Sequence, residues 1–428
     1  MKPPRPMIIY NLFPLLAGPF LRWRPHLERA AAMGFSWIFV NPIQRTGKSG
    51  SLYAVDSYDA FDPRLLDPAS RLAPQAQLQA AMTAAGQLGL HMMIDLVADH
   101  CAVDSALVKR RPAWFIWEGA GQVARPFCLE NGKKVVWTDL AKFDHRHTQD
   151  PEGLYRYFAR VVEKLYQQGF RAFRCDAAYQ VPTAFWTRLI REAKAAHPDA
   201  IFLAETLGCP LDVTLRLAGA GFDYLFNSLK WWDYRGTWLP KQYLLMREVA
   251  ETVSFAESDD TPRLAEELDG NFEACKQRYL VSALFSAAVM MPMGFELGFR
   301  RRLHVVRTRP EDWEETGVDL TAYVRRVNAI KAGHPIFQEE SPLELHHYGD
   351  DNILLLWKGS ATTREEALLV VNRDLKGEHP FHCDNLGWFV QSDAPLVDLT
   401  PGHNLRRVRS PFHHELRPAE ALVLVAKR

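Results

Sequence analysis

The chain has 428 residues, which is enough for two or three domains or for one large α/β barrel with an appendage. Lysine plus arginine and aspartate plus glutamate both total 51, so the formal net charge is zero. This balance excludes a global field that would attract nucleic acid or an anionic membrane, and we expect neither as a partner.

The cysteines and the apolar runs indicate in which cellular compartment the protein is expected. Six cysteines, at positions 101, 128, 175, 209, 275 and 383, form no CxxC pair and no metal-ligand spacing. We interpret them as free thiols and expect a cytoplasmic protein. The apolar run 7–20 follows Lys2 and Arg5, but Asn11, Pro14 and Pro19 interrupt it, so it suits a strand better than a signal peptide. The run 279–295 falls short of the roughly 20 apolar residues that span a bilayer.

Short β-rich runs alternate with amphipathic helical patterns in the first half of the chain. This alternation is typical of βα units around a parallel sheet. The expected strands are 7–12, 36–40, 91–97 and 169–176, and the expected helices are 24–33, 74–88, 152–168 and 183–196. The loop 41–63 after the second strand is long enough to carry function. Its Tyr53 and Tyr58 either stack on a sugar face or pack on the barrel rim.

The third strand runs into D-L-V-A-D-H, which ends in Asp99 and His100 and contains Asp95. By itself this pattern suits a hydroxyl-binding group, a cation site or a plain hydrogen-bonded cluster. Residues 101–150 then break the βα rhythm with several aromatic residues and few helical signals. We expect a small inserted subdomain that overhangs the pocket.

The rhythm resumes with strands 201–205, 222–226, 252–257 and about 289–293, followed by helix 320–332. The sequence therefore predicts a (β/α)8 TIM barrel with a short insertion after the third strand. Beyond Pro335 the pattern changes to period-two strands, at 353–357, at 367–371 and near the end, which predict a C-terminal antiparallel β-sandwich. The expected domains are 1–335, with the insertion at about 101–150, and 336–428.

Four of the predicted strand ends carry acids. They present Asp95 with His100, Arg174 with Asp176, Glu205, and Asp259 with Asp260. Side chains at the carboxyl ends of barrel strands face the pocket. Retaining cleavage of a glycosidic bond needs two carboxyl groups about 5 to 5.5 Å apart, one to attack and one to protonate the leaving oxygen. A structural ion pair is the alternative for Arg174 and Asp176, and a solvated side chain is the alternative for Glu205.

The same segments resemble the four motif regions of the α-amylase superfamily, in order. They are D-L-V-A-D-H, G-F-R-A-F-R-C-D-A-A, F-L-A-E-T and A-E-S-D-D-T-P-R. The resemblance implies that Asp176 is the nucleophile, Glu205 the general acid/base and Asp260 the transition-state stabiliser. It also implies substrate-binding or positioning roles for Tyr53, Asp95, His100, Arg174, Asp259 and Arg263.

The chain departs from the superfamily pattern at several positions. Asp259 stands where the fourth region usually has His, and Asp99 stands where calcium-dependent members have a ligand Asn. Because the insertion after the third strand is short, we expect no complete calcium site of six to eight oxygen ligands, and we expect no metal and no cofactor. The sequences of these motifs are most similar to those of the maltosyltransferase branch, although Ala177 replaces the Asn that usually follows the nucleophile there.

The expected function is that of a retaining enzyme on short α-1,4-linked gluco-oligosaccharides, through a covalent glycosyl-Asp intermediate resolved by water or by a sugar. One alternative is an α-1,4-glucan:maltose-1-phosphate maltosyltransferase. An alternative of another class is a catalytically inactive binding or scaffold protein. The oligomeric state stays open.

Overall fold

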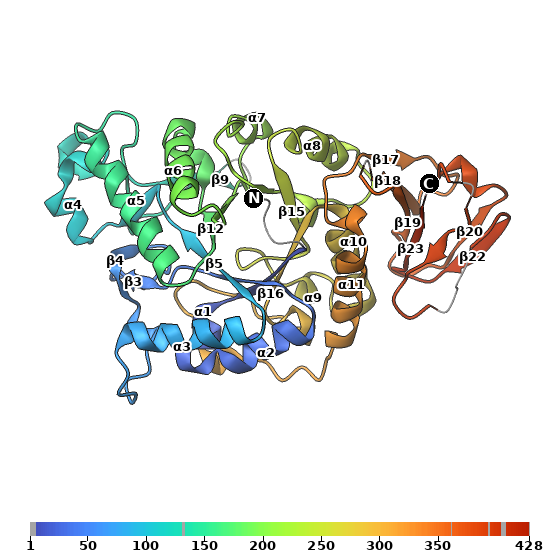
Figure 1. Ribbon diagram of the computed structural model, residues 1–428, viewed down its shortest axis with the longest axis horizontal. Helices are drawn as coiled ribbons and strands as arrows, with labels where there is room; N and C mark the ends of the chain where they lie inside the picture. The colour runs from blue at the N-terminus through green and yellow to red at the C-terminus, as the bar shows by residue number, and fades with distance from the viewer. Residues whose placement is uncertain (1–5, 131–132, 361, 393, 404–407, 428) are drawn as a thin grey trace.

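The computed structural model describes residues 6–130, 133–360, 362–392, 394–403 and 408–427, and its centre is a closed barrel of parallel strands. The strand order around the barrel is β1, β16, β15, β14, β13, β12, β5, β2 (Figure 1). Their bounds are β1 (Met7–Leu12), β2 (Trp37–Val40), β5 (His91–Leu96), β12 (Ala172–Cys175), β13 (Ile201–Ala204), β14 (Tyr224–Phe226), β15 (Glu251–Phe255) and β16 (Ala288–Pro292). The predicted TIM barrel is confirmed.

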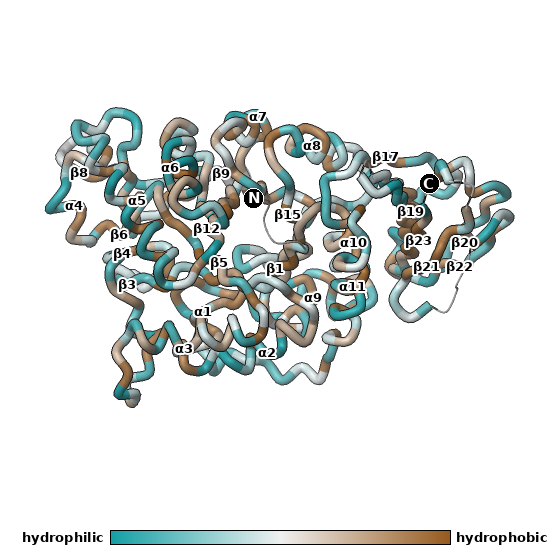
Figure 2. Tube along the Cα trace, viewed as in Figure 1, coloured by the Kyte–Doolittle hydropathy of each residue, from teal (hydrophilic) through white to brown (hydrophobic). Residues whose placement is uncertain are grey.

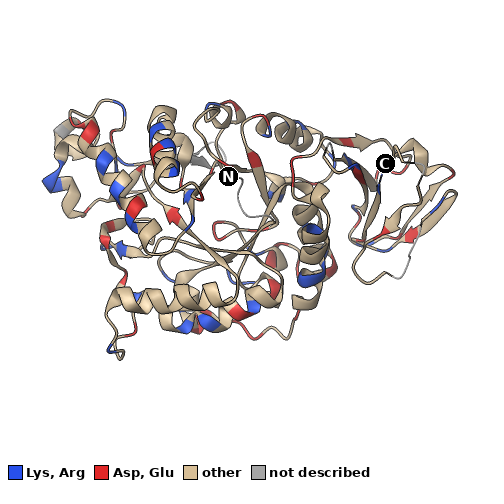
Figure 3. Cartoon of the chain, in the orientation of Figure 1, with Lys and Arg blue, Asp and Glu red and all other residues tan. Residues whose placement is uncertain are grey.

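The barrel strands are apolar on both faces because each face meets other protein. Side chains alternate along a strand, so Met7 and Ile9 fill the barrel interior while Ile8 and Tyr10 pack outward against the helices. Figure 3 shows charged residues of both signs on the surrounding helices. Continuous burial of this kind is the reason that the strands read as short apolar runs in the sequence.

The helices form the outer layer. They are α1 (Pro14–Ala17), α2 (Arg24–Ala32), α3 (Pro74–Gln87), α4 (Ala106–Arg110), α5 (Pro151–Gln167), α6 (Thr183–Ala196), α7 (Leu211–Leu215), α8 (Trp238–Met246), α9 (Leu264–Glu267), α10 (Phe272–Phe285) and α11 (Thr321–Gly333). The sequence did not predict α10. It is buried on nearly every side, between the barrel and the C-terminal strands, so it lacks the one-sided apolar stripe of a surface helix.

Two segments between barrel strands contain additional β-structure. The expected loop 41–63 holds an antiparallel pair, β3 (Gln44–Thr46) and β4 (Val55–Phe61), with two register shifts that hide any simple alternation. The insertion after β5 is confirmed as a short, mainly β segment. Besides α4 it contains β6 (His100–Ala102), β7 (Trp117–Glu118), β8 (Gln122–Val123), β9 (Phe127–Glu130), β10 (Lys133–Val136) and β11 (Leu140–Lys142).

The C-terminal part is antiparallel, as predicted. One sheet has the order β17 (Leu343–His346), β18 (Ile353–Gly359), β19 (Glu365–Asn372), β23 (Ala421–Lys427), β21 (Val397–Asp398), and a second pairs β20 (His379–Cys383) with β22 (Phe412–Leu416). One face of the larger sheet joins the core of the barrel, and the other forms a second core with β20 and β22. Figure 2 shows the resulting hydrophobic colouring of β19 and β23. We propose a domain boundary near residue 335, between α11 and β17.

Two buried lysines connect the C-terminal end of α10 to neighbouring elements. Lys331 of α11 donates to the carbonyl oxygens of Ala283 (2.8 Å) and Ser286 (2.7 Å) and also to that of Phe337. Lys358 of β18 donates to the carbonyl of Phe285 (2.7 Å), and burial lowers its pKa to about 8. The last carbonyls of a helix lack intrahelical partners, so the two ammonium groups cap α10.

Two further findings concern the cysteines and the helices. Cys101, Cys175, Cys209, Cys275 and Cys383 form no disulfide, and the side chain of Cys128 lies outside the described residues. Across the described part of the chain, the helices are too short or too polar to cross a lipid bilayer.

Replacing Lys331 should destabilise the junction between α10 and α11. Lys331→Ala leaves buried carbonyl oxygens without their donor, and we expect a loss of about 3 kcal/mol in the free energy of unfolding. Urea denaturation followed by circular dichroism measures this loss. Arg326→Ala, an exposed change on the same helix, is the control and should shift stability by no more than about 0.5 kcal/mol. Equal midpoints for the two variants would show that Lys331 does not stabilise this junction.

Candidate active site

Side chains from the carboxyl ends of β5, β12, β13 and β15 meet at one mouth of the barrel. Asp95 lies beside Arg174 in the register of neighbouring strands, and Arg174 also reaches Asp176. Glu205, which follows β13, accepts a hydrogen bond from the backbone next to Asp176. Asp259 is connected to Asp95 through Tyr53. Side chains that lie far apart in the sequence therefore form one continuous polar cluster.

Arg174 is the buried cation of this cluster. Its side chain is 4% exposed, and its Nη1 lies 2.8 Å from both oxygens of Asp95 and 3.2 Å from Oδ1 of Asp176. The rings of Phe39 and Phe226 pack near the guanidinium. Burial raises the pKa of the Asp95 and Asp176 carboxyls, and the Arg174 charge opposes this rise.

The backbone turns sharply after Asp176. Ala177 has the left-handed dihedral angles φ 40° and ψ 45°, which a residue with a Cβ rarely adopts. This turn directs the Ala177 amide to Oε2 of Glu205, at 2.9 Å. Strained backbone of this kind clusters at functional sites, and here it fixes the predicted acid/base beside the predicted nucleophile.

Glu205 is buried and held at both oxygens. Oε1 accepts a hydrogen bond from the Leu207 amide at 2.5 Å, and Oε2 accepts the one from Ala177. Burial raises the pKa of Glu205 to about 7, against the opposing effect of Arg174 and with a further contribution from the Asp176 carboxylate. A carboxyl group with this pKa holds a proton near neutral pH and is suited to general acid catalysis.

The same polar cluster continues around Tyr53. Its hydroxyl donates to Oδ2 of Asp95 at 2.8 Å and accepts a hydrogen bond from Asn41 at 3.0 Å. The Asn41 amide also donates to Oδ2 of Asp259 at 2.7 Å. Sequence reasoning missed Asn41, although its position directly after the second strand signals a place at the mouth. The hydroxyl contacts hold the Tyr53 ring at the mouth, where it is partly exposed.

Asp259 and Asp260 have different surroundings. Asp259 is buried against Asn41 and Tyr53, whereas the side chain of Asp260 is open to a cavity of about 640 Å³ that both residues line. Although Asp260 is open to this cavity, the surrounding protein and then the Asp259 carboxylate raise its pKa. Asp259, which stands in place of the usual His, is thus held by residues after the second strand, whereas Asp260 faces the cavity.

His100 is a buried neighbour of Asp176. Its Nδ1 lies 2.8 Å from Oδ1 of Asp99. Burial lowers the pKa of His100, but the Asp99 carboxylate outweighs this effect and the net shift is upward. Ligand atoms of Asp99, His100 and Asp176 lie within 4.8 Å of one another, a spacing that also suits a cation. The expectation of a site without metal stays a prediction.

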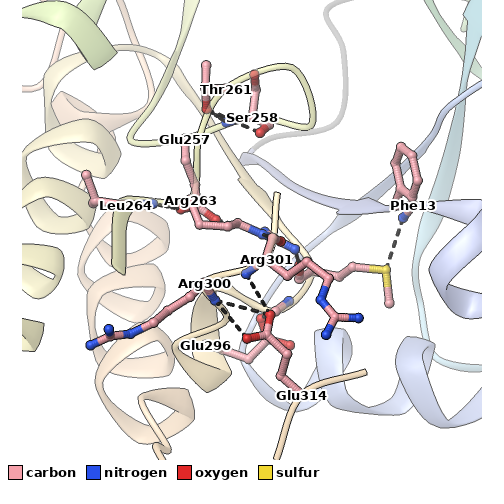
Figure 4. A network of polar contacts seen from close by, with 12 residues as sticks. Phe13, Glu257, Ser258, Thr261, Arg263, Leu264, Glu296, Arg300, Arg301 and Glu314 are labelled. Atoms are coloured by element: carbon pink, nitrogen blue, oxygen red, sulfur yellow. Dashed lines mark hydrogen bonds and ion pairs between the residues drawn. The ribbon is translucent and has the colours of Figure 1, made fainter. Parts of the chain in front are cut away.

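Two sequence candidates make structural contacts instead. Arg263 lies in a buried pair with Glu257 at 2.9 Å and donates to the carbonyls of Met293 (2.9 Å) and Arg301 (3.2 Å) (Figure 4). These contacts connect the segment after β15 to the segment after β16, so the structure does not bring Arg263 to the polar cluster. Tyr58 is buried on the barrel rim, where its hydroxyl donates to the carbonyl of Val97 at 2.8 Å.

Comparison with known proteins finds sequence similarity to named glucan-active enzymes over most of the chain. Residues 5–115 match the family described as glycogen debranching enzyme, glucanotransferase domain. The chain is 26% identical to an α-1,4-glucan:maltose-1-phosphate maltosyltransferase of Burkholderia pseudomallei over 88% of its length, but it spans only 34% of that protein. For the enzyme of that name from Mycobacterium tuberculosis H37Rv, the identity is 26%, over 84% of this chain and 54% of the relative.

Solved structures share the fold over the full length. An α-amylase from Geobacillus thermoleovorans superposes with a TM-score of 0.80 at 14% identity, covering 100% of both chains. A debranching enzyme of Nostoc punctiforme gives a TM-score of 0.73 at 16% identity, also covering 100% of both chains. The shared fold and the sequence similarity to maltosyltransferases relate the chain to enzymes of the α-amylase superfamily.

Proposed function

We propose that the chain is a retaining enzyme that acts on short α-1,4-linked gluco-oligosaccharides. One observation carries the proposal. At a single barrel mouth, Asp176 lies beside a buried arginine, while Glu205, one backbone contact away, has a pKa raised to about 7. Two carboxyl groups at one barrel mouth, one beside a buried cation and the other with a pKa near neutrality, are suited to the attack and the protonation that retaining cleavage requires.

The proposed reaction has two displacement steps. Asp176 attacks the anomeric carbon while Glu205 transfers its proton to the glycosidic oxygen, so the bond breaks and a glycosyl ester forms on Asp176. Glu205, now ionised, then removes a proton from water or a sugar hydroxyl, whose oxygen attacks the same carbon and releases Asp176. Asp260, open to the cavity, stabilises the positive charge that develops on the ring in both steps.

The relatives favour transfer to a glucan as a second candidate. Their name describes maltosyl transfer from maltose 1-phosphate. Against the maltosyltransferase stands Ala177, whose methyl side chain offers no hydrogen bond to a phosphate. The inactive scaffold remains the alternative of another class, and the presence of Asp176, Glu205 and Asp260 argues against it.

We further propose that the enzyme works in the cytoplasm, which the unpaired cysteines support.

Incubation with candidate donors distinguishes these readings. We expect turnover of α-maltosyl fluoride and of maltoheptaose, with products separated by chromatography. Release of phosphate from maltose 1-phosphate, with elongation of the glucan, would select the maltosyltransferase instead. Absence of turnover with all three donors would favour the scaffold.

Trapping the intermediate tests the role of Asp176. A 5-fluoro-α-glucosyl fluoride should form a long-lived ester, because the ring fluorine disfavours the positive charge of the second step. Peptide mass spectrometry should find the sugar on Asp176, and Asp176→Asn should carry none. A label on Asp260 or Glu205 would contradict the assignment.

The pH profile tests the role of Glu205. Only its protonated form serves as the acid, so kcat/KM on maltoheptaose should fall about tenfold per pH unit above its pKa of about 7. Glu205→Gln should lower this activity about 10²- to 10⁴-fold. Fluoride leaves without protonation, so the variant should still form the intermediate from a glycosyl fluoride. An unchanged alkaline limb in Glu205→Gln would contradict the role.

A further inference from the structure

The segment after β16 is rich in arginine and is held rigidly. Residues 299–309 read F-R-R-R-L-H-V-V-R-T-R. The Glu314 carboxylate accepts hydrogen bonds from the amides of Arg300 (3.1 Å) and Arg301 (2.8 Å), and Arg263 donates to the Arg301 carbonyl (Figure 4). The Arg302 guanidinium donates to the backbone carbonyl of Asp260. This segment is therefore fixed against the loop that carries the predicted stabiliser.

The same segment forms one wall of the cavity beside Asp260. The cavity measures about 640 Å³, within the range of pockets that bind small molecules. Asp259 and Asp260 line it on the side of β15. The segment after β16 contributes the following lining residues: Arg301, Arg302, Leu303, His304, Val305, Arg307, Thr308 and Asp312.

Two of the cavity arginines have no carboxylate partner among the described residues. Arg301 pairs with Asp312. Arg302 donates only to a backbone carbonyl, and the Arg307 side chain makes no hydrogen bond or ion pair within the described part of the chain. His304 Nδ1 accepts a hydrogen bond from the Val306 amide at 3.1 Å, which leaves the ring proton on Nε2 as a further donor. Arginine suits phosphate and carboxylate because its planar group offers paired donors.

The position of this wall indicates which part of a substrate it contacts. Asp260 lines this cavity together with the segment after β16, and as the proposed stabiliser it acts on the sugar ring that becomes attached to Asp176. The leaving oxygen must lie beside Glu205, because that residue protonates it. A group held in the cavity beside Asp260 is therefore on the sugar that Asp176 retains and not on the leaving group.

We propose that this cavity binds an anionic substituent, a phosphate or a carboxylate, on the glycosyl part of the donor that becomes attached to Asp176. This proposal rests on the proposed function and narrows its substrate class. It differs from the use of maltose 1-phosphate, in which the phosphate is the leaving group and would lie near Glu205.

Activated donors with and without a charge test the proposal. The panel contains α-maltosyl fluoride, 6′-phospho-α-maltosyl fluoride, and the glucosyl, 6-phosphoglucosyl and glucuronyl fluorides. We expect kcat/KM for at least one anionic donor to exceed that of its neutral counterpart at least tenfold. Arg307→Gln should reduce the preference about ten- to a hundredfold and leave the neutral donor within about twofold. The exposed Arg326→Gln on α11 is the matched control and should change neither value.

Several results would overturn the anionic site. They are equal turnover of charged and neutral donors, a preference that survives in Arg307→Gln, and turnover of maltose 1-phosphate that exceeds that of every anionic fluoride. Each leaves the proposed retaining chemistry intact.

A binding measurement separates this proposal from a failure of the proposed function. If no fluoride reacts, the proposed function fails, and calorimetry with glucose, glucose 6-phosphate, maltose 6′-phosphate and inorganic phosphate decides about the site. Tighter binding of either sugar phosphate than of glucose, lost in Arg307→Gln, supports it. Binding of inorganic phosphate as tight as that of both sugar phosphates would assign the cavity to a free anion and overturn the proposal, as would no binding at all.

Discussion

The candidate site depends on one buried guanidinium. Arg174 satisfies Asp95 and contacts Asp176 in a place where two unpaired carboxylates would cost several kcal/mol each. Because Asp95 is also held by Tyr53, and Tyr53 and Asp259 are both held by Asn41, the single cation organises acids and amides from four strand ends. Two features of the site follow from this arrangement. Asp176 keeps a cationic neighbour, and Asp259 is drawn toward the second-strand loop while Asp260 stays open to the cavity.

Much of the barrel was predictable because its strands and most helices have strong local patterns. β1 was predicted to the residue, and so was α6, whose start follows Pro182. In contrast, α10 carries apolar residues around its whole circumference. Its sequence therefore lacks the 3.6-residue period that would distinguish a helix from a buried strand. The strand pair β3 and β4 was not predicted either, because its register shifts remove the alternation of apolar and polar residues that marks a strand.

The strand-end acids were predictable as a set, but their individual surroundings were not. A position at the carboxyl end of a strand is a property of the local sequence, and it places Asp176 and Glu205 correctly near one mouth. Whether such a side chain contacts solvent, an amide group or a backbone carbonyl depends on the tertiary structure around it. Arg263 is the last residue of the fourth segment, yet its side chain turns toward Glu257. The strand-end position of Asn41 predicts a place at the mouth, but no acid beside it in the sequence marked it as a candidate.

The end of α10 has a consequence for how the barrel and the C-terminal strands depend on each other. Its final carbonyls are capped from two directions, by Lys331 of the last barrel helix and by Lys358 of the appended sheet. One cap is therefore supplied by each part of the protein. Cutting the chain before β17 would expose part of the shared apolar face and withdraw one of these caps, so a shortened barrel would be a weakened fragment. Evolutionary exchange of the appended strands would accordingly require a donor at the position of Lys358.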